Sequence, residues 1–335
     1  LNVGLMMSLA RTDNWRLPDD NAFSNPLQMA ALTPFTPFID PNTNLPAGAP
    51  PGDVNIPLYY NPILSIDYAD FVQTSYRNLT NTYAQVNLLP GLKFRSEWGL
   101  DLLNMNEEAY FQSQTVRNQS RASNGIGANY GTFVTNYNAN NFFNYLKDFG
   151  RHSIDATLGM SYQQSQTKRN YIEGTQFPSD SYRKIASAAV KSDGTSTETN
   201  YRFLSYFTRV NYRFNDRYLL GASARVEGSS RFGKNSRYGF FPSVSAGWVI
   251  SEENFLKNNN LISFLKLRAS YGLTGNAEIG DFPQLGLFQG DAGYVGAPGQ
   301  RPSQIANPDL KWESSRQVDI GIDFGILNNR INGEI

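Results

Sequence analysis

Apolar and polar residues alternate along most of this chain, most clearly in the stretch 218–251. From Leu220 to Val226 every second residue is apolar, and the residues between them are polar or glycine. The pattern returns at Ser243–Trp248. Successive side chains of a strand point to opposite faces, so each stretch predicts a strand with one apolar and one polar face. The glycine-rich segment Gly228–Gly239 predicts the turn that joins them into a hairpin.

The same alternation recurs through the chain and predicts about eleven strands in total. The expected strands run through Asn2–Arg11, Tyr76–Leu89, Leu92–Leu102, Phe142–Leu146, Ile154–Tyr162, Leu204–Tyr212, Leu220–Glu227, Val244–Ile250, Leu265–Leu273, Val318–Phe324 and Ile331–Ile335. An apolar face that recurs over so many strands is too large for one small core, and sheets of this size usually curl or close.

The connections between these strands alternate between short and long. Short turns are expected after Leu89, Tyr145, Arg213, Ile250 and Phe324, the fourth with a helical turn at Phe255–Lys257 capped by Ser251–Asn254. Long loops are expected at Pro18–Pro62 (with a helical turn near Pro26–Leu32), Gln112–Asn129, Glu173–Thr199 and Gly275–Pro308. Because antiparallel strands place successive connections at opposite ends, one end of the sheet has tight turns and the other has long loops. This asymmetry is typical of outer-membrane barrels, so we predict an all-β, antiparallel transmembrane β-barrel with its apolar face toward lipid.

Composition agrees with this prediction and excludes several functions. The 335 residues contain 29 Lys and Arg against 29 Asp and Glu, which argues against a nucleic-acid partner. Charged residues are only 17% while aromatic residues reach 13%, as suits a surface partly in lipid. There is no cysteine, hence no disulfide or thiol site. Mean hydropathy is −0.44, and no apolar run approaches the ~20 residues of a membrane helix, whereas a barrel strand needs only ~10 residues with alternate ones apolar.

Several stretches resemble one family of outer-membrane proteins. RVEGSSRFGKNSRYGFFPSVSAGWVISEE (Arg225–Glu253) resembles the signature hairpin of the SusC-like (RagA-like) TonB-dependent transporters, departing mainly at Glu227, where aspartate is usual. Shorter matches follow the family's order along the chain: NPIL at Asn61–Leu64, GLKFRS at Gly91–Ser96, LKLRASYGLTGN at Leu265–Asn276 and NPDLKWE at Asn307–Glu313.

The resemblance implies a plugged barrel of about 22 strands, of which residues 1–335 would be roughly half of the wall. It also implies an outer-membrane location, coupling to the TonB complex and a SusD-like surface lipoprotein as partner. The chain begins at Leu1 rather than methionine and ends inside an expected strand, and neither plug nor coupling box is found. We therefore expect an internal piece of the barrel domain, without its plug and final strands.

Charged residues on the polar face of the expected strands are candidate pore-lining groups. They are Lys93, Arg95, Glu97, Arg225, Glu227, Lys266, Arg268, Asp319 and Asp323. The simpler interpretation, which we favour, is that they hydrate the lumen or pair with one another, because barrel interiors of this class are polar. Arg231 and Arg237 are expected to fix the hairpin turn between them.

Aromatic residues divide between two expected roles. Tyr182, Phe288 and Tyr294 lie in long loops and are candidate substrate contacts, which would stack on sugar rings; the alternative is that they pack on loop neighbours. Trp98, Tyr212, Trp248 and Tyr271 lie on the apolar face of strands and are expected in the interfacial girdle.

No catalytic, cofactor or metal site is predicted. His152 is the only histidine and adjoins a tight turn, so a Ser–His pair at the outer rim cannot be assembled. Asp40–Asn44 resembles a calcium loop superficially, but Leu45 replaces the required glycine. Gly125-Ile126-Gly127 lacks the third glycine of a nucleotide fingerprint.

We therefore expect a non-enzymatic importer of a large nutrient, an oligosaccharide or a peptide. The alternative is a passive porin or a structural outer-membrane barrel, which would conduct without energy coupling.

Overall fold

The computed structural model describes residues 1–17, 39, 41, 44, 66–113, 123–257, 259 and 261–335. The expected helical turn near Pro26–Leu32 lies outside these residues, as does nearly all of the expected loop Pro18–Pro62.

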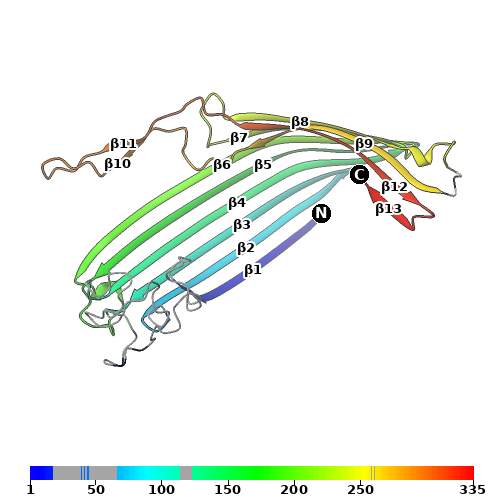
Figure 1. The fold of residues 1–335 in the computed structure, drawn as a ribbon. Coiled ribbons are helices and arrows are strands. Elements are labelled where there is room, and N and C mark those ends of the chain that lie inside the picture. The colour runs from blue at the N-terminus through cyan, green and yellow to red at the C-terminus, as the bar shows by residue number, and fades with distance from the viewer. Residues whose placement is uncertain are drawn as a thin grey trace.

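Eleven strands form one antiparallel sheet in which each strand pairs with the next along the chain (Figure 1). The number agrees with the prediction. The strands are β1 (Asn2–Trp15), β2 (Ala69–Leu89), β3 (Leu92–Phe111), β4 (Ile126–Phe149), β5 (His152–Thr175), β6 (Val190–Phe214), β7 (Tyr218–Ser229), β8 (Tyr238–Val249), β9 (Ile262–Asn276), β12 (Glu313–Ile326) and β13 (Ile331–Glu334). The sheet is strongly curved and open, and resembles a section of a barrel wall. Among the described residues, no helix is long and apolar enough to cross a membrane.

Several strands are longer than the alternation predicted. The expected strand Phe142–Leu146 is the 24-residue β4, so the expected loop Gln112–Asn129 gives way to strand at Ile126. The expected loop Glu173–Thr199 was also too long, because β5 continues to Thr175 and β6 starts at Val190. At ~3.3 Å per residue, 24 residues span roughly 80 Å, far more than the ~30 Å hydrocarbon core. The added residues are rich in Asn, Thr, Gln and Ser, and where both faces meet water no apolar alternation is needed.

Two further segments differ from expectation. The expected loop Gly275–Pro308 contains a small separate hairpin made of β10 (Leu287–Gln289) and β11 (Arg301–Gln304). At the expected helical turn Phe255–Lys257, the Lys257 amide donates to the Glu253 carbonyl at 2.9 Å, as in one helical turn, but a 3-10 turn that was not expected, η3 (Ile250–Glu252), precedes it. A second 3-10 turn, η2 (Ile185–Ser187), lies between β5 and β6.

The tight turns fall at one end of the sheet, as predicted. Gly91 adopts φ +83° after β2, and Asn215 and Asp216 adopt φ +52° and +55° between β6 and β7. Glycine, asparagine and aspartate tolerate this left-handed region best, which explains why these positions turn the chain. We call this the short-turn end and the opposite end the long-loop end.

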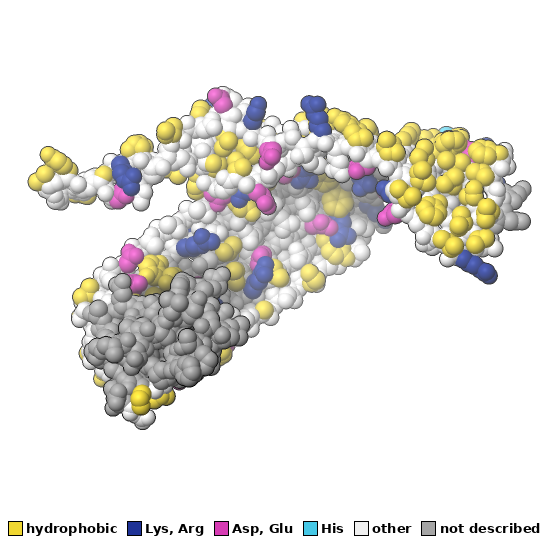
Figure 2. Space-filling model, viewed as in Figure 1, with side chains coloured by type: hydrophobic (Ala, Val, Ile, Leu, Met, Phe, Trp, Pro, Cys, Tyr) yellow, Lys and Arg dark blue, Asp and Glu magenta, His cyan; other side chains and the backbone are white. Residues whose placement is uncertain are grey.

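The two faces of the sheet differ in chemistry. Large apolar side chains stand exposed on the convex face, for example Val244 (55% exposed) and Ile320 (75%). Polar side chains occupy the concave face, where acidic and basic groups lie in the hollow beneath the arch (Figure 2). Among the described residues only a few apolar side chains are buried, so the sheet is held by its hydrogen-bonded ladders rather than by a core beneath it.

Candidate functional site

The concave face gathers the charged residues that the alternation placed there, and most of them pair with one another. Arg95 bonds Glu97 at 2.6 Å, and Arg225 bonds Glu227 at 2.7 Å, each along its own strand. Lys266 (3.2 Å) and Arg268 (2.9 Å) on β9 both donate a hydrogen bond to the carboxylate of Asp323 on β12.

The remaining two candidates have weaker contacts. Asp319 accepts a hydrogen bond from Ser270 at 3.3 Å, again between β12 and β9. Lys93 is exposed at the second position of β3, beside the short-turn end. The nine predicted residues thus lie on one face but fall into separate groups rather than one site.

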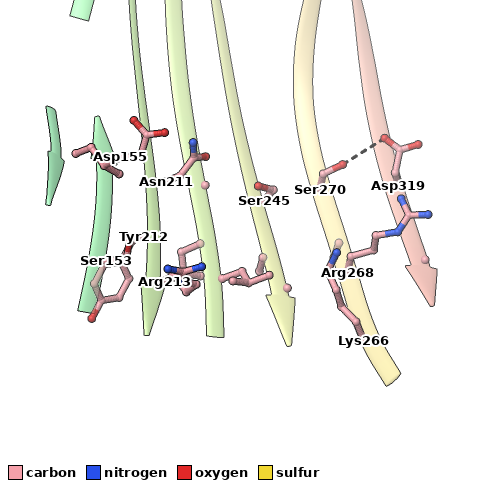
Figure 3. A pocket seen from close by; sticks show the side chains of 18 residues that line it. Ser153, Asp155, Asn211, Tyr212, Arg213, Ser245, Lys266, Arg268, Ser270 and Asp319 are labelled. Atoms are coloured by element: carbon pink, nitrogen blue, oxygen red, sulfur yellow. Dashed lines mark hydrogen bonds between the residues drawn. The ribbon is translucent and has the colours of Figure 1, made fainter. Parts of the chain in front are cut away.

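A depression of about 580 Å³ lies in the short-turn half of this face (Figure 3). Small residues form its floor, because Gly221, Ser245 and Gly247 occupy neighbouring positions on β7 and β8. Asp155 and Arg213 line one side, and the β9–β12 charges line the other: Lys266, Arg268 and Asp319. The sequence predicted Lys266, Arg268 and Asp319 as lining charges, but neither the opposite side nor the floor of glycine and serine between the two sides. Such a surface can hold a polar chain or a polar solute by hydrogen bonds and ion pairs.

Two arginines enclose two phenylalanines and a central glycine in a row across the middle of the concave face. The strand registers place Arg95, Phe142, Gly159, Phe207 and Arg225 in one row from β3 to β7. The Arg225 guanidinium lies 5.9 Å from the Phe207 ring centroid. Phenylalanines on a polar face break the expected alternation, which is the signal that could have identified this row from the sequence.

A third group lies toward the long-loop end, outside the segments that the sequence predicted as strand. Tyr130 and Tyr171 stack with centroids 4.7 Å apart, and both pack against the buried cluster that contains Phe71. Tyr171 donates a hydrogen bond to Glu173 at 2.7 Å. Arg16 forms an ion pair with Glu107 beside them. Most of this group comes from neighbouring strands, β2 to β5. Its residues meet only because of the registers of those strands, which cannot be read from the amino-acid composition.

The three loop aromatics do not converge on one place. Tyr182 lies in the β5–β6 connection and is 59% exposed. Phe288 is in β10 and Tyr294 is between β10 and β11, with 67% and 82% exposed. The β10–β11 hairpin projects beyond the long-loop ends of its neighbouring strands (Figure 1).

Arg231 and Arg237 act outside their own hairpin as well as within it. Arg231 pairs with Asp281 at 3.0 Å. The Arg237 carbonyl accepts from the Ser229 amide within the hairpin and from the Trp312 indole outside it.

Aromatic side chains gather at the short-turn end. His152 is half-buried with its Nδ1 2.6 Å from the Tyr212 hydroxyl, and Phe149 stacks on its ring. Trp248 donates from Nε1 to Glu253 in the β8–β9 connection. The hydrogen bond from the Tyr218 hydroxyl, with those from Trp248 and Arg217, lowers the pKa of Glu253 below its ordinary value. Trp98 and Tyr271 are exposed on the convex face.

Within the described part of the chain, no three His, Cys, Asp or Glu residues cluster as metal ligands would.

Comparison with known proteins agrees with this two-faced sheet. The family described as TonB dependent receptor-like, beta-barrel, matches residues 14–335. TonB-dependent receptor P39 of Formosa agariphila is 35% identical over 254 residues, which cover 75% of this chain and 24% of that protein. TonB-dependent receptor SusC of Bacteroides thetaiotaomicron is 34% identical over 257 residues, which cover 74% of this chain and 25% of that protein. The chain therefore spans about a quarter of the length of these relatives.

A solved structure gives the same fold. The RagAB peptide transporter matches with TM-score 0.86 and 25% identity, covering 99% of this chain and 37% of that one. The apolar convex face, the polar concave face and these matches lead to one conclusion: this chain belongs to the TonB-dependent receptors and is part of their outer-membrane β-barrel.

Proposed function

We propose that the complete protein is an active importer of a large nutrient across the outer membrane, powered through TonB. The observation that carries this proposal is the concave face, a polar wall with paired charges behind an apolar lipid-facing surface. A wall of this kind lines an aqueous path, because charged groups facing lipid would be costly.

Residues 1–335 form one part of the barrel domain in this proposal, and a plug and further strands complete it. The pore-lining groups are the nine charges named above, from Lys93 to Asp323. The pairing of seven of these residues with one another keeps the wall nearly neutral, which suits a bulky cargo of low net charge. Tyr182, Phe288 and Tyr294 would contact cargo before it enters, since aromatic faces stack on sugar rings and on peptide side chains.

The proposed partners are a SusD-like surface lipoprotein and the TonB complex, and the proposed cargo is an oligosaccharide or a peptide. Support comes from relatives of two kinds: SusC among the proteins, and RagAB, which is named a peptide transporter, among the structures. The two-faced wall suits either cargo, because both are polar chains too large for simple pores.

Uptake by cells and conductance of the pure protein test the proposal together. The complete gene is expressed in its host, and growth on candidate glycans and peptides is measured with and without TonB. We expect growth on one class of cargo that requires TonB. We also expect the pure protein to be silent in planar bilayers until its plug is deleted. Growth independent of TonB, with steady conductance of the intact protein, would instead establish a passive porin.

A further inference from the structure

Two stretches that carry the family resemblance interlock in space. The β7–β8 hairpin turn (Ser229–Arg237) belongs to the first, and Asn307–Trp312 to the second. The Gly233 amide donates to the Leu310 carbonyl at 3.1 Å, and the Trp312 indole donates to the Arg237 carbonyl at 3.0 Å. A side chain on Gly233 would overlap the Pro308 carbonyl, so only glycine permits this approach. We call this set of contacts the interlock.

The interlock also holds the other end of the same loop. Arg231 forms an ion pair with Asp281 at 3.0 Å, with both side chains only 15% exposed, and donates to the Ala277 carbonyl at 2.9 Å. The side-chain amide of Gln284 donates from Nε2 to the Ser230 carbonyl at 2.8 Å. Both the outgoing and the returning chain of the β9–β12 loop are therefore tied to one hairpin.

Aromatic side chains fill the interior of the interlock. Phe232 is fully buried, and its ring lies 4.6 Å from that of Trp312. Phe241 packs against the same indole in an edge-to-face arrangement, with ring centroids 5.3 Å apart, and the Arg231 guanidinium lies 4.1 Å from the Tyr201 ring centroid. These rings pack on one another and on the guanidinium, so their role is to make a firm base rather than a platform for a ligand.

An arm (Phe282–Ala306), which contains β10 and β11, extends from this base. Its exposed side chains include Phe288 and Tyr294, and in Figure 1 it stands clear of the sheet at the long-loop end. Within the part of the chain that the structure describes, the hydrogen bonds and ion pairs of the arm, apart from those of Gln284 near its root, join residues of the arm to one another, such as Arg301 and Asp291 at 2.7 Å. A two-stranded hairpin alone is marginally stable in water. Its direction must therefore be set at its root.

We propose that the interlock is a positioning device, in which Arg231, Gly233 and Trp312 set the direction in which the arm leaves the long-loop end of the barrel. The buried ion pair supplies most of the constraint, because an ion pair removed from water is weakly screened and its loss leaves an unpaired charge. This role follows from contacts within the chain and does not depend on which cargo the complete protein carries.

Distances between two spin labels test the device in the complete protein in detergent. This chain has no cysteine, so Tyr294→Cys on the arm and Ser196→Cys on exposed β6 introduce the only label sites within it. We expect one narrow distance distribution, broadened about twofold or more when Arg231→Ala or Gly233→Val frees the arm's root. Arg301→Ala is the matched control, since it breaks an exposed arginine pair within the arm and should leave the distribution narrow.

Two further variants exclude general misfolding as the cause. Gln284→Ala changes only the arm side of the interlock and should broaden the distribution in a barrel that still shows heat-modifiable migration on gels. The double variant Arg231→Asp with Asp281→Arg restores the ion pair in the reverse order, so its distance distribution should be narrower than that of Arg231→Ala. A distribution that stays narrow in Arg231→Ala and Gly233→Val, or that Arg301→Ala broadens equally, would overturn the proposal.

Discussion

Trp248 and Glu253 are joined across the start of the β8–β9 connection by a hydrogen bond of 3.1 Å from the indole Nε1 to the carboxylate. The same carboxylate accepts from the Tyr218 hydroxyl at 2.7 Å and from Arg217 at 3.0 Å. One acidic group thus ties the ends of β7 and β8 to the turn that follows them. An aromatic residue at a barrel rim usually orients toward the interface, and here its polar atom has a protein partner as well.

We expect Glu253→Gln to destabilise the complete barrel at neutral pH and to make little difference in acid. The hydrogen bonds lower the folded-state pKa of Glu253 below the ordinary value of 4.5. Stability from a lowered pKa is fully present above the unfolded-state value and is lost as pH falls through the folded-state value. The melting temperatures of the wild type and Glu253→Gln, followed by heat-modifiable migration from neutral pH to about pH 3, should therefore converge on acidification.

Glu252→Gln provides the control for that experiment. Glu252 adjoins Glu253 but only faces Lys257 at 3.7 Å, with both side chains about half exposed. Exposed pairs of this kind contribute little, so this variant should track the wild type at every pH. A constant gap between the wild type and Glu253→Gln across the range would argue against the network.

The alternation of apolar residues predicted the sheet wherever lipid meets one face and water the other. In β7, Leu220 and Val226 stand on one face and Arg225 and Glu227 on the other, as the sequence indicates. The same reasoning failed in β4, where only Phe142–Leu146 was expected to be strand. Its other residues carry Asn and Thr on both faces, so register with β3 and β5 holds them as strand without a regular apolar pattern.

The candidate site was predictable in its side-chain types but not in its grouping. Alternation placed Lys266, Arg268 and Asp323 on one face, yet only the β9–β12 register brings Asp323 within reach of both cations. Contacts between loops could not be predicted from the sequence either, because they too join residues that are far apart along the chain. Arg231 meets Asp281 fifty residues away, and no local pattern specifies that pairing.

Adjacent residues on β8 provide a test of which face meets lipid. Val244, in the middle of β8, is exposed on the convex face, and Ser245 is exposed on the concave face. We expect Val244→Arg to lower the free energy of unfolding of the complete barrel by about 2–4 kcal/mol, the cost of arginine near the bilayer midplane. Ser245→Arg should cost less than ~1 kcal/mol, since the lumen is polar. Urea unfolding in lipid vesicles measures both, and equal costs would contradict the assignment of the faces.

Asp323 is expected to control the charge selectivity of the wall. Asp323→Asn leaves Lys266 and Arg268 without their shared carboxylate, although Arg268 retains Glu334 at 3.3 Å. We expect the anion-to-cation permeability ratio of the plug-deleted protein to rise about twofold, because rings of fixed charge set selectivity in pores. Reversal potentials under a salt gradient in planar bilayers measure this ratio.

Glu252→Gln is the matched control for selectivity. It removes one negative charge from the β8–β9 connection, where Glu252 faces Lys257 at 3.7 Å. Neither side chain lines the depression of the wall, so the ratio should stay close to that of the wild type. An equal rise in both variants would mean that Asp323 does not face the conducting path.

Gly159 is expected to be irreplaceable because Phe142 and Phe207 close over it from the neighbouring strands. A Cβ at this position would lie 2.6 Å from the Phe142 Cβ, 2.7 Å from the Phe207 ring and 2.8 Å from the Asn141 carbonyl oxygen. Rings could turn aside, but the backbone carbonyl cannot move without breaking the β4–β5 ladder, so Gly159→Ala should destabilise the complete barrel by about 1–3 kcal/mol. Gly194→Ala in β6 is the control, since its Cβ would meet only the Tyr171 carbonyl at 3.6 Å and should be neutral or slightly stabilising. Urea unfolding of both variants in lipid vesicles measures the difference, and equal stability would show that the two phenylalanines leave room at Gly159 in solution.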